Sequence, residues 1–396
     1  MSTGFFAGQS ASLLASHLGL QPFPPMVNHV WGWMVSLFAA IPIGPMAVRV
    51  NLLGAVCSAA SVWLLFHIMM RLTYSETFKQ RIPLKTSERS QLFAAVVASL
   101  ALMTAIPFWV VATRAHPLAF DLMLLLLSFH LLLRYGENGR TSYINGATLV
   151  YAVGLNDFAT LILFFPMFVL LALYELYRFQ ELRVSVIFRL IGIALVGLVP
   201  QFIAAALYAK SAAFEWRQFT HYGQVLWWMW HDQYMIVTRS VPRVGWLTVG
   251  VVSVVPWLAV YILGIGRRSA SAGSWLGTAL MCALLSALSG VILTNGLVSP
   301  WTITRGNPPL VTPYVLIAMW TGAMAGYWLA SLQRVGKGLW HNMGYGFIAI
   351  VIVAFGYLGY QNISTASGRP GGWFSRFADE TLDRMGASDV NLKWLI

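Results

Sequence analysis

The chain has 396 residues, of which 58% are hydrophobic and only 10% are charged, with a formal net charge of +12 and a mean hydropathy of +0.69. Soluble globular proteins carry about 25% charged residues, so this composition excludes a soluble enzyme, and its aromatic content excludes a disordered chain. The apolar runs approach the roughly 20 residues that cross a bilayer as a helix, longer than the segments of a membrane β-barrel. We expect an all-α, polytopic integral membrane protein.

Hydropathy predicts about ten transmembrane helices. The segment 26–43 is ambiguous, because it is almost long enough to span a membrane but begins with polar and aromatic residues such as Asn28 and His29. Gly322 and Gly326 have the spacing of a close helix–helix contact. The expected spans are 50–71, 91–113, 117–134, 141–155, 158–178, 187–209, 244–264, 275–293, 310–331 and 342–361.

The basic residues orient these spans. The interhelical loops on one side carry only Arg49, Arg114 and Arg305, whereas those on the other side carry many more cations, and such loops face the cytoplasm. We therefore expect a multi-pass protein of the cytoplasmic (inner) membrane. The cations form no patch or RNA-binding motif, so no nucleic-acid partner is expected. The cytoplasmic set is Arg71, Lys79, Arg81, Lys85, Arg89, Arg134, Arg140, Arg178, Arg183, Arg189, Arg267, Arg268, Arg334 and Lys337.

This orientation divides the chain into a transmembrane domain, 1–361, and an exterior tail, 362–396, which we interpret as the start of a truncated C-terminal domain. The segments 1–49 and 210–243 form exterior loops. Both cysteines, Cys57 and Cys282, lie inside apolar runs, so neither a disulfide nor a metal framework is expected from them.

Polar groups at membrane depth are costly and point to functional sites, and here they gather on the exterior side. Asp157 follows Asn156 at a helix break, while Arg114 and His116 occupy a neighbouring break, with Asp121 one turn further on. Each has a structural alternative. Asp157 could cap the following helix, His116 could be a turn residue, and Asp121 could pair with Arg114.

Two other exterior segments carry candidate binding residues. Arg305 and Asn307 precede the span at 310–331, where an arginine could grip a phosphate with two parallel hydrogen bonds or extend to lipid headgroups. The loop 210–243 is rich in aromatic residues, including Trp227 near His231. It could form an amphipathic helix at the membrane interface, or a lid whose rings stack on sugars.

A set of motifs links these segments to a known family. They are Gly8-Gln9-Ser10-Ala11-Ser12, Leu18-Gly19, Phe23-Pro24-Pro25, Ala47-Val48-Arg49-Val50-Asn51-Leu52-Leu53, Ala115-His116-Pro117 and Gly154-Leu155-Asn156-Asp157. They resemble the first exterior loop and following turns of GT-C glycosyltransferases, in the bacterial protein O-mannosyltransferase-like branch formerly described as a domain of unknown function. The resemblance implies that 26–43 is an exterior juxtamembrane helix. It also implies a polyprenyl-phosphate sugar donor held in membrane lipid, and a protein or glycan acceptor on the exterior, periplasmic side.

The sequence departs from this family at the expected base. Gln9 stands at the family's loop aspartate, Ser12 at the following glutamate, and His116 at a later glutamate. Glutamine cannot accept a proton at neutral pH. The base role therefore passes to Asp157 or His116, with Arg114 and Arg305 as phosphate contacts and Gln9 as a hydrogen-bonding group.

Further substrate contacts are expected from Ser12, Asn307, Trp227 and His231, and a divalent metal ion could take part. The missing loop acids also fit a different class, a non-catalytic lipid-glycan-binding protein or a subunit of a membrane assembly. A secondary transporter is disfavoured, because mid-span charges are nearly absent.

Overall fold

The computed structural model describes residues 28–72, 84–157, 159–211, 221–240, 311–334 and 339–366, together with Leu14, Leu18, Phe214 and Phe219, and every element within them is a helix. The helices are α2 (His29–Ala39), α3 (Met46–Leu72), α5 (Leu84–Thr104), α6 (Ile106–Ala112), α7 (Pro117–Asn138), α8 (Thr141–Leu155), α9 (Ala159–Arg178), α10 (Val184–Gly197), α11 (Val199–Ala209), α13 (Tyr222–Ser240), α17 (Val311–Arg334) and α18 (Leu339–Ala366).

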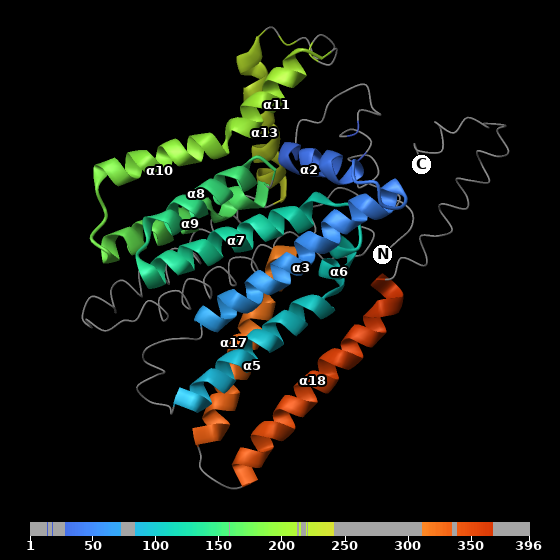
Figure 1. The fold of residues 1–396 in the computed structure, drawn as a ribbon, viewed down its shortest axis with the longest axis vertical. Coiled ribbons are helices and arrows are strands. Elements are labelled where there is room, and N and C mark those ends of the chain that lie inside the picture. Colours follow the sequence, from blue (N-terminus) through green and yellow to red (C-terminus); the bar gives the residue numbers. More distant parts are fainter. Residues whose placement is uncertain are drawn as a thin grey trace, which may run out of the picture.

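The longer helices lie side by side in a row (Figure 1). Along this row α10 packs on α8, α8 on α7, α7 on α3, α3 on α5, and α5 on α17. The short helix α2 and the start of α11 lie at the end of the row where α3 and α7 begin. Since consecutive helices reverse direction, the turns before α3, before α7 and after α8 meet at this same end.

Most of the predicted spans within the described residues are helices, including the separate helices on either side of Asn156-Asp157. In the part of the chain that the structure describes, three segments are long and apolar enough to cross a membrane, namely Met46–Arg71, Pro117–Asn138 and Val184–Ala209. The spans expected at 244–264 and 275–293 lie outside the described residues. The remaining count of about ten spans therefore stays a prediction.

Two predicted spans differ in shape from what was expected. The span 91–113 begins earlier, at Leu84, and breaks at Ala105 into α5 and α6. The span 187–209 breaks at Leu198 into α10 and α11. In both cases a proline, Pro107 or Pro200, occupies the first turn after the break. Proline fits a first helical turn but cannot donate the backbone hydrogen bond that would continue the preceding helix.

Small residues allow close helix crossings. Gly322 and Gly326 of α17 face Ala94 and Ser90 of α5, and a Cβ at Gly326 would lie 2.9 Å from the Ser90 carbonyl oxygen. The predicted packing role of this glycine pair is confirmed. Gly54 of α3 likewise allows the turn before α7 to approach closely, because a Cβ at this position would lie only 2.6 Å from the Arg114 carbonyl oxygen.

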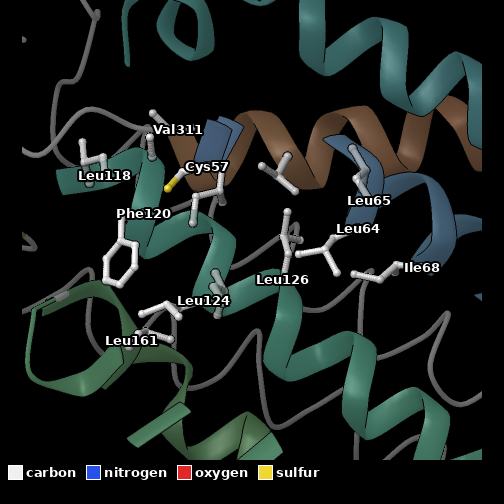
Figure 2. Close-up of a cluster of buried hydrophobic side chains, with 14 of the residues drawn as sticks. Cys57, Leu64, Leu65, Ile68, Leu118, Phe120, Leu124, Leu126, Leu161 and Val311 are labelled. Atoms are coloured by element: carbon white, nitrogen blue, oxygen red, sulfur yellow. The ribbon is translucent and has the colours of Figure 1, made fainter. Parts of the chain in front are cut away.

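The core of the bundle is aliphatic. Figure 2 shows side chains of α3, α7 and α9 meeting there, with Cys57 beside Leu118 and with Phe120 and Leu124 near Leu161. Cys57 is a buried free thiol, as its apolar context predicted. In contrast, α10 and α18 expose large apolar side chains, such as Phe188 and Val353. Exposed faces of this kind suit contact with lipid and fit a membrane protein.

Candidate functional site

Asp157 lies in the turn between α8 and α9, and its carboxylate is bonded to the start of α2. Its Oδ1 accepts a hydrogen bond from the Val30 backbone N–H at 3.1 Å, and its Oδ2 accepts one from the Trp31 N–H at 2.6 Å. The capping function weighed from the sequence is therefore present, but the capped helix is α2, 127 residues earlier. The Asp157 side chain is buried, at 5% exposure.

Helix α2 depends on this distant carboxylate because its own sequence provides no N-cap. Asn28 precedes the helix with a left-handed φ of 60° and makes no side-chain capping bond, and the first turn contains no acidic residue. The first N–H groups of a helix have no partner within it, and its N-terminal end carries partial positive charge. Asp157 satisfies two of these donors and complements that charge.

The neighbouring Asn156 binds the break between α10 and α11. Its Nδ2 donates to the Gly197 carbonyl oxygen at 2.9 Å, and its Oδ1 accepts from the Gln201 N–H at 3.1 Å. Its Nδ2 also donates to the carbonyl oxygens of Ala152 and Val153 at the end of α8. Asn156 thus binds backbone groups on both sides of the break, where the Gln201 N–H also donates to the Leu198 carbonyl oxygen at 3.0 Å. Two adjacent residues hold the end of α8, the α10–α11 break and the start of α2.

His116 is the N-cap of α7, in agreement with the turn role weighed from the sequence. Its Nδ1 accepts a hydrogen bond from the Leu118 N–H at 3.2 Å, so the neutral ring carries its proton on Nε2. That Nε2 is buried and has no hydrogen-bond partner among the described residues. Burial, together with the charge of Arg114, lowers the pKa of His116 to about 4, so the ring is neutral at neutral pH.

Asp121 is buried beside Asp157, at 1% exposure. Its Oδ1 has no hydrogen-bond partner within the described part of the chain, and the carboxyl that acts on it electrostatically is Asp157. The ion pair with Arg114 considered from the sequence stays a prediction. Burial raises the pKa of Asp157, against the opposing effect of the backbone hydrogen bonds from α2. Two buried carboxyl groups that interact electrostatically each disfavour the ionised form of the other.

Two arginines lie at this end of the bundle. Arg114 follows α6 and is partly buried, which lowers the pKa of its guanidinium from the ordinary value. Arg49, in the first turn of α3, donates from Nη1 to the carbonyl oxygens of Ala39 and Ile41, the latter at 2.8 Å. Both carbonyl groups lie at the C-terminal end of α2. The sequence presented Arg49 as an exterior-loop cation and as part of a motif, and a short helix without caps of its own could have signalled the need for such a residue.

Of the other predicted site residues, the structure describes Trp227 and His231. Trp227 and His231 stack on one another on α13, with ring centres 4.6 Å apart and an angle of 18°. This helix packs on α11 and α9 around its own small core. The aromatic segment is thus helical over Tyr222–Ser240, and Trp227 is 58% exposed. Gln9, Ser12, Arg305 and Asn307 lie outside the described residues, as does the tail beyond Ala366.

The structure assigns no metal ligands in this region. Within the described ranges, no group of three or more His, Cys, Asp or Glu side chains is arranged to hold a metal ion. The polar cluster instead consists of two carboxyl groups, a neutral imidazole and a partly buried guanidinium. Such a set can hold or move a proton and can bind an anion.

Comparison with known proteins places a family resemblance on this part of the chain. Residues 4–182 match the family model described as the Protein O-mannosyl-transferase TMEM260 N-terminal domain. No curated protein and no solved structure matches the chain. The matched segment contains α2, α3, both turns that carry His116 and Asp157, and the motifs quoted above for the resemblance. The comparison supports the O-mannosyltransferase-like family for this segment.

Proposed function

We propose that this protein transfers a sugar, mannose in the first instance, from a polyprenyl-phosphate carrier to a hydroxyl group of a protein or glycan acceptor. The reaction takes place on the exterior side of a bacterial inner membrane, within a GT-C-like helical domain. One observation carries the proposal: a buried polar cluster at one end of an apolar helical bundle, inside the segment similar to an O-mannosyltransferase domain. Buried ionisable groups at membrane depth are expensive to keep without a function.

In the proposed step the acceptor oxygen attacks the anomeric carbon of the sugar. The bond between that carbon and the phosphate oxygen breaks, and polyprenyl phosphate leaves with the bonding electrons. The hydroxyl proton passes to the carboxyl pair formed by Asp157 and Asp121. Asp157 is the favoured acceptor of this proton, because burial raises its pKa towards the range useful for a general base. A carboxylate that accepts two backbone bonds still has lone pairs available.

His116 suits a different role from the base that the sequence allowed. Its Nδ1 lone pair is occupied by the Leu118 N–H, so the free position of the ring is a donor. We propose that the Nε2–H donates a hydrogen bond to an oxygen of the sugar donor or of the leaving phosphate. The Arg114 guanidinium supplies positive charge nearby. Arg305 and Asn307 are proposed as further phosphate contacts, Gln9 and Ser12 as acceptor contacts, and Trp227 with His231 as a stacking surface for sugar.

A second candidate is a protein that binds the lipid-linked glycan without transferring it. Both carboxylate oxygens of Asp157 accept hydrogen bonds from α2. At the loop position where the similar family has an aspartate, this chain has Gln9. These two facts favour binding over catalysis if Asp157 serves only to hold α2. Binding and transfer are measured separately below.

The test uses the full chain in nanodiscs with polyprenyl-phosphate mannose. Mass spectrometry reports bound carrier, and mannose incorporation into serine- and threonine-containing peptides reports transfer. We expect both for the natural chain. In Asp157→Asn we expect binding with transfer lost, because the amide keeps one capping acceptor but cannot take the proton.

Three results would count against parts of this proposal. Unchanged transfer in Asp157→Asn would remove the base role of Asp157. Carrier binding without transfer by the natural chain would favour the binding protein. Absence of both binding and transfer would overturn the proposal.

A further inference from the structure

Helix α2 is held at its two ends by oppositely charged residues from other elements. Asp157 accepts hydrogen bonds from the Val30 and Trp31 N–H groups at the start, and Arg49 donates to the Ala39 and Ile41 carbonyls at the end. A helix is partly positive at its N-terminus and partly negative at its C-terminus. Each charged residue therefore stands at the end of α2 that its charge stabilises.

Helix α2 is too short to be stable without such contacts. It has 11 residues, and its last turn contains no basic residue just as its first turn contains no acidic one. Isolated helices of fewer than about 12 residues are marginal in water. Docking of Trp31 and Val35 into the core provides the apolar part of its stability. The caps from Asp157 and Arg49 provide the polar part.

The position of Arg49 within α3 strengthens this interpretation. It lies in the first turn of α3, where a positive charge opposes the dipole of its own helix. Its Nη1 points to carbonyl oxygens of the α2 terminus, where a positive charge is favourable. The residue thus stabilises α2 at the expense of α3, which argues for a specific role in holding α2.

We propose that Arg49 is a positioning residue, which together with Asp157 docks α2 as one cooperative unit and thereby fixes where the segment 1–27 joins the bundle. Gln9 and Ser12, the proposed acceptor contacts, precede α2 in the sequence, so we expect a loss of α2 docking to weaken acceptor binding. The effect on transfer rests on the proposed function, whereas the docking of α2 does not.

Cooperative docking predicts that a substitution at one end of α2 changes hydrogen exchange at the other end. If α2 opens as a unit, loss of Arg49 at the C-terminal end accelerates hydrogen exchange at Trp31 near the N-terminal end. Loss of Asp157 likewise accelerates exchange at Ala40. If each cap only prevents local fraying, each substitution affects its own end alone.

The experiment is residue-resolved hydrogen exchange on the full chain in nanodiscs, for the natural protein, Arg49→Gln, Arg49→Lys and Asp157→Ala. We expect Arg49→Gln to accelerate exchange along all of α2 by roughly tenfold or more, as loss of charged hydrogen bonds implies. Lys should restore part of the protection through its charge. The matched control is Arg140→Gln, because Arg140 precedes α8 but makes no side-chain capping bond, and it should leave α2 unchanged.

Exchange in Arg49→Gln that is unchanged, or faster only at the end next to Arg49, would overturn the inference. Arg49→Lys keeps the test valid if Arg49→Gln does not fold. In the transfer assay, Arg49→Gln should raise KM more than it lowers kcat, whereas Asp157→Asn should lower kcat. If the natural protein shows no transfer but its α2 is protected from hydrogen exchange in a way that depends on Arg49, this inference stands and only the proposed function is rejected.

Discussion

The two ends of the bundle use polar residues in different ways. At the end with α2, the side chains of Asn156, Asp157 and His116 are buried. Asn156 and Asp157 bind backbone groups of other helices, and His116 caps α7. At the opposite end of α7, polar side chains bind one another nearer the surface. There Arg71 and Glu137 form an ion pair at 3.1 Å, with side chains 16% and 44% exposed.

This difference determines what each substitution costs. Removing a buried partner leaves a backbone donor or acceptor with neither a partner nor water, which costs the full desolvation penalty. Removing an exposed partner lets water or a lipid headgroup take its place. The end with α2 should therefore be sensitive to single substitutions, and the opposite end should tolerate them.

The largest effect is expected for Asp157→Ala. The substitution leaves the Val30 and Trp31 N–H groups without their acceptors, and should reduce the free energy of unfolding by about 3 kcal/mol. Thermal unfolding of the full chain in detergent measures this loss. Asp121→Asn is the control, because Asp121 is also a buried carboxyl and its Oδ1 has no hydrogen-bond partner among the described residues. An equal loss in both variants would mean that burial of charge, and not the cap, governs this end.

The next effect is a pH dependence caused by His116. Its pKa falls from 6.5 in the unfolded chain to about 4 in the folded protein, through burial and the charge of Arg114. The folded state thus favours the neutral ring, and this contribution is fully present above pH 6.5. It is lost as the pH falls from 6.5 to 4, by up to about 3 kcal/mol.

His116→Asn tests this assignment. The amide oxygen can still accept the Leu118 N–H, but the side chain does not titrate. Compared with the natural protein, the variant should lose less stability between pH 6.5 and pH 4. Parallel stability curves over this range would show that other groups cause the acid sensitivity.

Much of this end could be predicted from the sequence, but its connections could not. The helix break at Asn156-Asp157 followed from loop charges, and the turn at His116 from the proline after it. Local rules of capping connect residues a few positions apart, so they directed Asp157 to α9. Its actual partner is α2, and only tertiary packing brings the two together. Similarly, the motif around Arg49 could be recognised in the sequence, whereas the contact of Arg49 with the end of α2 is seen only in the structure.

An intermediate effect is expected for Asn156→Ala. At the α10–α11 break the Gly197 carbonyl oxygen would lose its side-chain donor, and the Gln201 N–H would keep only its backbone bond to the Leu198 carbonyl oxygen. We expect a cost of about 2 kcal/mol in unfolding free energy. Thr148→Ala is the control on the same helix, because its hydroxyl bonds only to the Ile144 carbonyl one turn earlier. Similar unfolding temperatures for the two variants would mean that the break needs no support from Asn156.

The smallest effect is expected for Glu137→Gln at the opposite end. The carboxylate is 44% exposed and binds one guanidinium, so neutralising it should cost less than about 1 kcal/mol and the cost should shrink with added salt. Arg71 keeps access to solvent after the change, and no backbone group loses a partner. Unfolding at low and high salt measures both features. If Glu137→Gln destabilised the chain as much as Asp157→Ala, exposure would not explain the contrast between the two ends, and the ion pair would have to be treated as part of the helix framework.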